Sequence, residues 1–286
     1  MTITNIETKQ MKKILFLLSI TLFLISCEEE ISVLTLDNSK PVITGYLYAG
    51  QSIDSIRITE SISYTSDGTL TVIDDLNVVI SNEEENFELN STGNGYYSYP
   101  EHVVKEGLTY EISFDYEGEQ VSASTYVNPK KTIELSESIV SLEKIEYDGT
   151  LGGLRDAVPE QIVVDINWDN TELDYYFTII ENTEANPEYV NGIIEFLADN
   201  SVLPETFFRS EPEITDVHSI NSTRELQFFG NYDITVFRLN PEYAALYESI
   251  GSSTISLQEP PSNVNNGLGI FTSVTPHHLT LRVVKK

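Results

Sequence analysis

Cysteine is almost absent from this chain of 286 residues, since Cys27 is its single example. One cysteine allows no disulfide within the chain and no zinc site built from several thiolates. No segment runs for about 18 consecutive apolar residues, so the sequence predicts no transmembrane helix. Any attachment to a membrane must therefore come from an anchor other than a transmembrane helix.

Motifs of the common enzyme classes are also missing. No G-x-S-x-G elbow or phosphate-binding loop occurs. The histidines lack the H-x-x-x-H and H-E-x-x-H spacings; they are His102, His218, His277 and His278. We expect a turn or the start of a strand after Pro276, and two adjacent histidines in a strand point to opposite faces and cannot share a metal. The sequence predicts no catalytic residue and no metal site.

Positive charge is scarce, with 16 Lys and Arg against 45 Asp and Glu. Removing residues 1–26 leaves 13 basic and 44 acidic residues, a net charge of −31. Such a charge repels nucleic acid and anionic lipid head groups. Acidic clusters could bind calcium, but none forms the D-x-[DN]-x-[DN]-G loop, and we expect solvated turns instead. These clusters are Asp74-Asp75 and the set Asp165, Asp169 and Asp174.

The most informative stretch lies near the N-terminus. Two lysines precede the apolar run Ile14–Ile25, which has the length of a signal-peptide core and is too short to span a bilayer. The run ends Leu24-Ile25-Ser26-Cys27, which resembles a bacterial lipobox. We therefore predict a signal peptide at residues 1–26, with Met11 as the natural start, and lipidation of Cys27.

Three acyl chains on Cys27 exceed the two signals that anchor a protein stably to a membrane. Glu28, Glu29 and Glu30 follow directly and resemble the export signals that send lipoproteins of Bacteroidota to the cell surface. A plain solvated tether is the alternative. We expect residues 27–39 to form an acidic tether at the outer membrane, with the protein facing the extracellular side.

Residues 40–128 have the pattern of short β-strands. Pro41 to Tyr48 and Ile53 to Thr59 are rich in β-branched and aromatic residues, and Leu108 to Phe114 alternates between apolar and polar. Seven or eight such strands at roughly ten-residue spacing predict an immunoglobulin- or transthyretin-like β-sandwich. Asn128-Pro129 is a plausible boundary.

Residues 129–286 predict a second β-rich domain with two short helices. The tetrapeptide Asn-Pro-Glu-Tyr occurs at 186–189 and 240–243, and apolar residues at helical spacing follow each copy. We expect each copy to begin a helix, with its Asn as the cap. A hairpin is expected around Gly230-Asn231, from Glu225–Phe229 and Tyr232–Arg238. Ile270–Val274 and Leu279–Val284 are expected to close the chain as two strands.

A partner of so acidic a protein should meet it at an uncharged centre with aromatic anchors. Phe207-Phe208 and Phe228-Phe229 offer such anchors. If each pair lies in a strand, one ring can face outward and the other the core; burial of both pairs is equally compatible. A second candidate aromatic surface is Tyr96, Tyr97 and Tyr99, of which at least one must face the core.

Several segments together resemble the Bacteroidota lipoprotein family known as domain of unknown function 4249. The most specific is Pro261-Ser-Asn-Val-Asn-Asn-Gly-Leu-Gly-Ile-Phe271, which is similar to the closing P-x-N-I-x-N-G-x-G-x-F signature of that family, with Val264 for isoleucine. The others are Pro41–Leu47, Gly95-Tyr-Tyr, Tyr175-Tyr176 and Asn240–Gly251. We expect the signature to be a fixed loop that delivers Ile270 and Phe271 into the core, because its Asn and Gly residues permit left-handed backbone.

The resemblance implies an outer-membrane lipoprotein, often encoded beside a TonB-dependent transporter, with no established activity and no agreed catalytic residues. We therefore expect a non-enzymatic accessory or binding partner of such a nutrient transporter. A structural or adhesion module of the cell surface is the alternative. A hydrolase with an unrecognised site is the third hypothesis.

Overall fold

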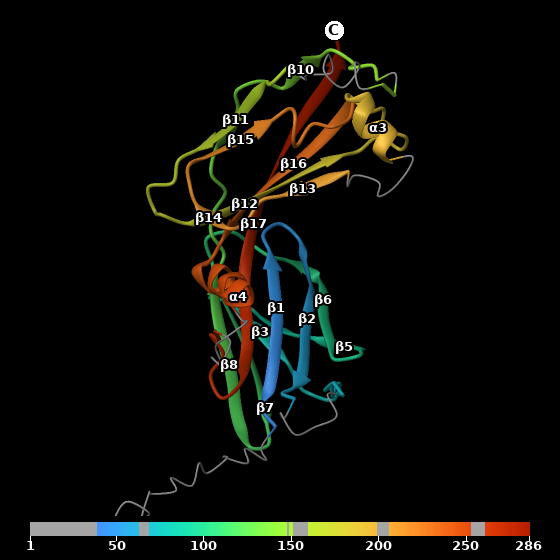
Figure 1. Cartoon of the computed structure of the whole chain (residues 1–286). Helices are drawn as coiled ribbons and strands as arrows, with labels where there is room; N and C mark the ends of the chain where they lie inside the picture. Colours follow the sequence, from blue (N-terminus) through green and yellow to red (C-terminus); the bar gives the residue numbers. More distant parts are fainter. Residues whose placement is uncertain (1–38, 63–68, 148, 151–159, 199–205, 253–260) are drawn as a thin grey trace, which may run out of the picture. The chain divides into compact units, whose positions relative to one another are not determined.

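The computed structural model describes residues 39–62, 69–147, 149–150, 160–198, 206–252 and 261–286. The fold is mainly β, as predicted (Figure 1). Cys27 and Glu28–Glu30 lie outside the described residues. Within the described ranges, no helix has the length and apolar character that crossing a membrane requires.

Ten strands form the large sheet. Its order is β13 (Phe207–Arg209), β12 (Tyr175–Asn182), β16 (Gly230–Leu239), β17 (Leu268–Lys285), β1 (Pro41–Tyr48), β2 (Ser52–Glu60), β6 (Tyr96–Val103) and β5 (Asn90–Gly93). Two further strands pair at its sides, β10 (Ile139–Leu142) with β17 and β14 (Glu213–Ile214) with β12. The large sheet therefore contains strands from both predicted domains.

Two smaller sheets complete the described fold. A four-stranded sheet has the order β4 (Asn86–Glu88), β3 (Val79–Ser81), β7 (Thr109–Tyr116) and β8 (Glu119–Tyr126). A three-stranded sheet has the order β15 (Val217–Asn221), β11 (Val163–Trp168) and β9 (Ile133–Leu135). Each small sheet shares a hydrophobic core with part of the large one.

The first core lies between the four-stranded sheet and the β1–β2–β6 part of the large sheet. Ile43 and Ile56 come from the large sheet, and Ile112 and Val121 from the small one; all four are fully buried. Alternating residues of each strand face this core, which is the pattern that predicted a sandwich. Two sheets around one core are the arrangement of a β-sandwich.

The second core lies between the three-stranded sheet and β12, β16 and β17. Val164 and Ile166 of β11 meet Ile180 of β12, Ile234 of β16 and Leu281 of β17. The face of β11 opposite the core carries Asp165 and Asn167, so the alternation in its sequence sets which face is buried. The C-terminal part is therefore also built from two sheets.

The closing strands were predicted wrongly as two, because β17 is one strand of 18 residues. Its first part pairs in parallel with β1 through Val274, and its second part pairs antiparallel with β16 from Val274 to Val283. Phe271 consequently belongs to the first core and Leu281 to the second. The first core therefore includes residues from both sides of the predicted boundary at Asn128-Pro129, because β17 pairs with β1 and contributes Phe271.

Pro276 lies inside β17, contrary to the turn or strand start that was expected there. The Val274 carbonyl accepts a hydrogen bond from Ala49, and Arg282 N–H donates to Ser138. Both partners lie on the edge opposite β16, so even-numbered residues of β17 direct their backbone groups away from β16. Proline at position 276 therefore removes no hydrogen bond to β16.

The two helices exist, although only one begins as predicted. Helix α4 (Pro241–Ser252) begins at the second Asn-Pro-Glu-Tyr copy. Helix α3 (Gly192–Ala198) begins after the first copy, and the side-chain oxygen of Asn191 accepts from Ile193 N–H at 2.9 Å. The first copy instead makes a bridge between Tyr189 and Phe228. An asparagine nearer the apolar run caps that helix.

The predicted cap role of Asn240 is also wrong, since its side chain points into the junction between the two cores. Its amide group donates to Thr125 Oγ1 at 2.8 Å and to Ser273 Oγ at 3.1 Å. Asn128 donates to its oxygen at 2.6 Å. These bonds join β8, β17 and the start of α4, because a buried amide needs partners for every polar atom.

The signature loop delivers its last residues into the core as predicted. Phe271 is fully buried and Ile270 nearly so. The side chain of Asn263 donates to the Phe271 carbonyl at 2.7 Å and accepts from its N–H at 3.0 Å. Asn266 has a φ of 54° and donates to the Gln120 carbonyl. The asparagines thus hold the entry to β17 through backbone contacts.

The buried His277 predicts a loss of stability in mild acid. Burial, followed by the nearby Lys130 charge, lowers its pKa from 6.5 to about 4, and Lys131 N–H donates to its Nε2. The unfolded chain therefore binds this proton at a higher pH than the folded chain, so stability falls as pH drops from 6.5 towards 4. Between pH 7 and pH 5, the free energy of unfolding should fall by about 2 kcal/mol less in His277→Gln than in the unmodified protein, as measured by thermal unfolding. An unchanged pH dependence would contradict the buried neutral state.

Candidate functional site

The predicted contact residues Phe207 and Phe208 lie on β13 and divide as expected. The Phe207 side chain is 49% exposed, whereas Phe208 packs against the second core. Strand β13 pairs with β12 near the end of the large sheet. One aromatic anchor of this pair is therefore available on the surface.

The second predicted pair gives no exposed anchor. Phe228 and Phe229 are 3% and 7% exposed. In place of the expected hairpin strand, residues 222–225 form a turn and Phe228 makes a single bridge to Tyr189. Phe228 packs on Tyr189 with ring centroids 4.8 Å apart, and Lys285 Nζ lies over the Phe229 ring. Without a regular strand, adjacent side chains need not alternate, and both rings enter the second core.

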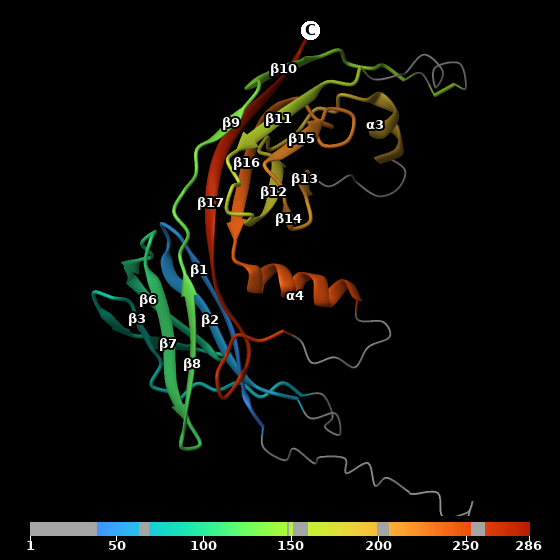
Figure 2. The ribbon, with the colours of Figure 1, turned by 90° about the vertical axis from the view of Figure 1, so that its left-hand side faces the viewer.

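Figure 2 shows α4 beside the large sheet. Aromatic rings from several elements gather between them. Phe177 of β12 stacks on Phe237 of β16 with centroids 4.5 Å apart, and on Tyr243 of α4 at 6.1 Å. Tyr46 of β1 contacts the Tyr243 ring edge-on at 5.9 Å. We call the surface formed by Tyr46, Phe177, Phe207, Arg209, Phe237 and Tyr243 the α4 face.

Strand alternation places these rings on one side of the sheet. In β12, Tyr176 and Ile180 face the second core, while Phe177 faces the opposite side and forms a small cluster with Leu239 and Val274. Helix α4 covers part of that side through Tyr243. The α4 face is thus the side of the large sheet that the three-stranded sheet does not cover.

Arg209 contributes a cation to this surface. Its guanidinium lies 4.8 Å from the centre of the Phe177 ring and donates to Tyr243 Oη at 3.2 Å. In the part of the chain that the structure describes, no carboxylate lies within ion-pair distance of it. A guanidinium held over a ring keeps donors free for a partner.

An apolar groove of ≈ 470 Å³ extends from the aromatic rings along β1. Val42, Thr44 and Tyr46 of β1 form its floor with Ile270 of β17, and Leu246 of α4 forms a wall. The rim includes exposed apolar side chains, with Ile62 50% and Leu70 42% exposed. Grooves of this size with few polar groups are common binding sites.

Arg209 is the one charged residue among those that define the α4 face. Burial, followed by the nearby Tyr243, raises the pKa of Tyr46 and of Tyr48 above 10, so both hydroxyls stay neutral. Tyr243 and Leu246 lie on one side of α4, three residues apart. The α4 face is therefore aromatic with one cation, and of the residues predicted for a partner contact it includes Phe207.

The tyrosines of β6 form a smaller aromatic patch. Tyr97 is fully buried, as at least one of the three had to be, and its hydroxyl donates to the Ile73 carbonyl. Tyr96 is 41% exposed beneath the guanidinium of Arg57, and Tyr99 packs on Phe87. This leaves Tyr96 as the exposed ring of this patch, as Phe207 is the exposed ring of the α4 face.

The remaining polar candidates are separated by the fold. His277 and His278 both lie in β17 and point to opposite faces, where His278 Nδ1 lies 3.1 Å from Thr235 Oγ1. Asp165 accepts from Ser219, and Asp174 pairs with Arg238. Among the described residues, no group of three or more His, Cys, Asp or Glu side chains could hold a metal ion.

Sequence reasoning missed most of the α4 face. Its members come from β1, β12, β13, β16 and α4, and no local motif connects them. The available signal was the alternation in β12, where aromatic residues occupy both faces of one strand. A strand with apolar residues on both faces must be covered on both, or must expose one of them.

A family model described as "Domain of unknown function (DUF4249)" matches residues 28–279. The match begins directly after Cys27 and includes every strand of the three sheets up to the middle of β17. None of the curated proteins matches the chain.

Proposed function

The chain belongs to the family of domain of unknown function 4249, and from this premise we propose that it is a lipid-anchored protein of the cell surface. In this role it is a non-enzymatic accessory of a TonB-dependent nutrient transporter. It acts by contact, and the α4 face supplies the contact. The transporter enters this proposal because the sequence resembles a family whose members are often encoded beside one.

The observation that carries this proposal is the chemistry of the α4 face. Interface centres are enriched in aromatic residues and arginine and depleted of other charges. The α4 face combines Phe207, Tyr243 and Arg209 with an adjoining apolar groove, on a chain whose acidic residues outnumber its basic ones 45 to 16. Such a surface fits a partner with an apolar centre and a less acidic rim.

Charge placed on the α4 face should abolish partner recovery. Phe207→Asp puts a carboxylate where an exposed ring stood, so folding is retained while the contact loses an aromatic anchor. Losing such an anchor costs about 2 kcal/mol or more, which lowers affinity roughly thirtyfold. Gentle detergent extraction and pull-down on the unmodified protein should recover a β-barrel transporter, and the variant should not.

Val103→Asp is the matched control, since Val103 is 53% exposed on β6 and Phe207 49% exposed on β13. It should recover the transporter as the unmodified protein does. Deleting residues 131–286 would test the contact less well than these point variants. The deletion also removes Phe271, which belongs to the first core, so the N-terminal part could unfold. Recovery of no barrel protein from unmodified cells would contradict the transporter role.

Lipidation predicts how the protein fractionates. Cys27→Ala should leave the chain without acyl chains, and it should move from the membrane to the soluble fraction, because a single weak signal does not anchor a protein stably. In intact cells, added protease should digest the unmodified protein, and replacing Glu28–Glu30 by alanine should protect it. Membrane retention of Cys27→Ala would rule out the lipid anchor.

The alternative role is a structural or adhesion module of the cell surface. The exposed aromatic ring of Tyr96 with Arg57 above it favours this alternative, because aromatic rings also serve as stacking platforms. Retention of the unmodified protein on a polymeric surface glycan, lost in Tyr96→Ala and kept in Phe207→Asp, would favour adhesion over the transporter role.

A further inference from the structure

One edge of β17 is paired at both ends and open in the middle. Strand β1 pairs with it in parallel up to Val274, and β10 pairs with it in parallel from Arg282. Strand β16 pairs with Val274 and with Arg282 as well, so β1 and β10 must both lie on the edge opposite β16. Between them, residues 275–281 pair with no other strand of the described chain on that edge.

The backbone groups that face this gap can be identified from the strand period. Val274 C=O and Arg282 N–H both point to the open edge, and the register with β16 is continuous between them. The N–H and C=O groups of His278 and Thr280 therefore point into the gap, together with the Pro276 carbonyl. No backbone hydrogen bond to them is found among the described residues.

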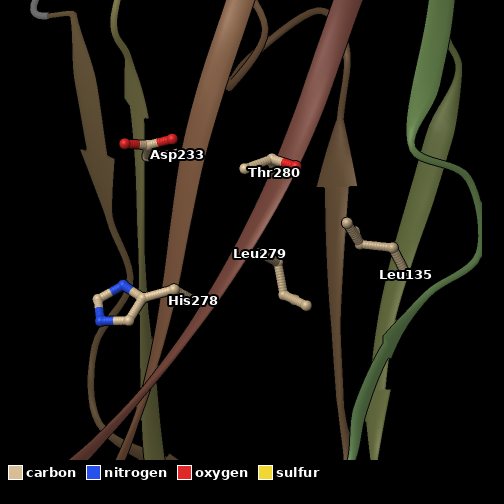
Figure 3. Close-up of a pocket in the computed structure, with 5 residues that line it drawn as sticks. All are labelled: Leu135, Asp233, His278, Leu279 and Thr280. Atoms are coloured by element: carbon tan, nitrogen blue, oxygen red, sulfur yellow. The ribbon is translucent and has the colours of Figure 1, made fainter.

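A pocket of ≈ 490 Å³ lies at the gap, lined by Leu135, Asp233, His278, Leu279 and Thr280 (Figure 3). Leu135 belongs to β9, which is the end strand of the three-stranded sheet. The view shows Leu135 on one side of β17 and His278 and Asp233 on the other. The pocket thus separates the end strand of one sheet from the open edge of the other.

We propose that this gap is a binding site for an extended segment of a partner polypeptide, which adds a short strand to β17. The flanking strands β1 and β10 limit the length of the added strand, since the eight steps from Val274 to Arg282 span about 26 Å. The N–H and C=O groups of His278 and Thr280 supply the main-chain hydrogen bonds, as in other complexes formed by strand addition.

The lining defines the chemistry of the segment. Side chains on one of its faces meet Leu135 and Leu279, so they are apolar, and alternate side chains meet His278 and Thr280 of β17, so they are polar. The acidic excess of the chain, 45 acidic to 16 basic residues, favours a neutral or basic segment. This site does not depend on the α4 face, and either can fail without the other.

The test uses the full chain in detergent and a displayed library of random heptapeptides as the probe. Selected peptides should alternate apolar with neutral or basic residues. Thr280→Pro removes the N–H that points into the gap and no hydrogen bond to β16, so it should weaken their binding about tenfold or more. Thr280→Ala keeps that N–H and should bind within about twofold of the unmodified protein.

Hydrogen exchange provides the second measurement, which needs no variant. In the protein alone, the amides of His278 and Thr280 should exchange faster than those of Leu279 and Leu281, which face β16. Bound peptide should slow the first two. The proposal is overturned if no peptide is selected, if Thr280→Pro binds as well as the unmodified protein, or if bound peptide protects other strands only. Slow exchange of both amides in the free protein would show that the chain fills its own gap, and would also overturn it.

Discussion

Replacing Asp174 by alanine is expected to lower the free energy of unfolding by about 3–5 kcal/mol, because it leaves a buried arginine without its counter-charge. Arg238 is 4% exposed, and its Nε donates to Asp174 Oδ2 at 2.7 Å, while Nη2 contacts the same oxygen. A third donor, Nη1, bonds the Pro129 carbonyl at 2.9 Å. The pair therefore ties the start of β12 to β16 and to the segment after β8.

Thermal unfolding measures this effect, and a fall in Tm of roughly 6–20 °C is expected for a chain of this size. The matched control is Glu84→Ala, which breaks the pair between Lys105 and Glu84 at 2.6 Å, with both side chains about half exposed. That exposed pair contributes less than about 1 kcal/mol. Asp174→Ala with Arg238→Met should recover much of the loss, because the buried charge is gone. Equal effects of Asp174→Ala and Glu84→Ala would contradict the burial of the first pair.

Gly269→Ala should also destabilise the fold by about 3 kcal/mol or more, since it combines backbone strain with a direct clash. Gly269 has a φ of +96°, and a Cβ there would lie 2.1 Å from the Ile43 carbonyl oxygen and 2.9 Å from its nitrogen. Ile43 is its partner in the β1–β17 register. Either atom can move only if the first residues of β17 separate from β1.

Gly107→Ala separates strain from the clash. Gly107 has a φ of +78°, and a Cβ there would have nothing within 4 Å. It should cost about 1–2 kcal/mol, the usual cost of a left-handed residue other than glycine. Chemical denaturation of both variants gives the comparison, and hydrogen exchange should show faster opening of β1 in Gly269→Ala alone. A cost at Gly269 no larger than at Gly107 would mean that β1 and β17 are held less closely than the register implies.

The strands that alternate cleanly were predictable, and those that serve two cores were not. In β7, Tyr110, Ile112 and Phe114 face one core and the residues between them face solvent, so the local pattern suffices. In β17, eight consecutive residues from Ile270 to His277 are buried. A window of a few residues there shows no alternation between buried and exposed positions. Pro276 also favoured the prediction of two separate strands.

The residues of the candidate site were predictable only in part. The acidic composition led us to predict an uncharged contact surface with aromatic anchors, and of the four predicted anchors Phe207 lies on the α4 face. Phe228 and Phe229 do not, because their segment makes a single bridge to Tyr189 and both rings enter the second core. Arg209 drew no attention in the sequence, since its role depends on Phe177 and Tyr243, which lie 32 and 34 residues away along the chain.

The sequence by itself determined the β-rich class, the start of α4 and the burial of Phe271, because each depends on period, capping or backbone freedom within a short window. Tertiary structure alone decided the joining of both cores by β17, the pairing of Asp174 with Arg238, and the assembly of the α4 face. These features depend on which strands become neighbours. That choice depends on contacts between residues distant along the chain, which no local pattern of side chains records.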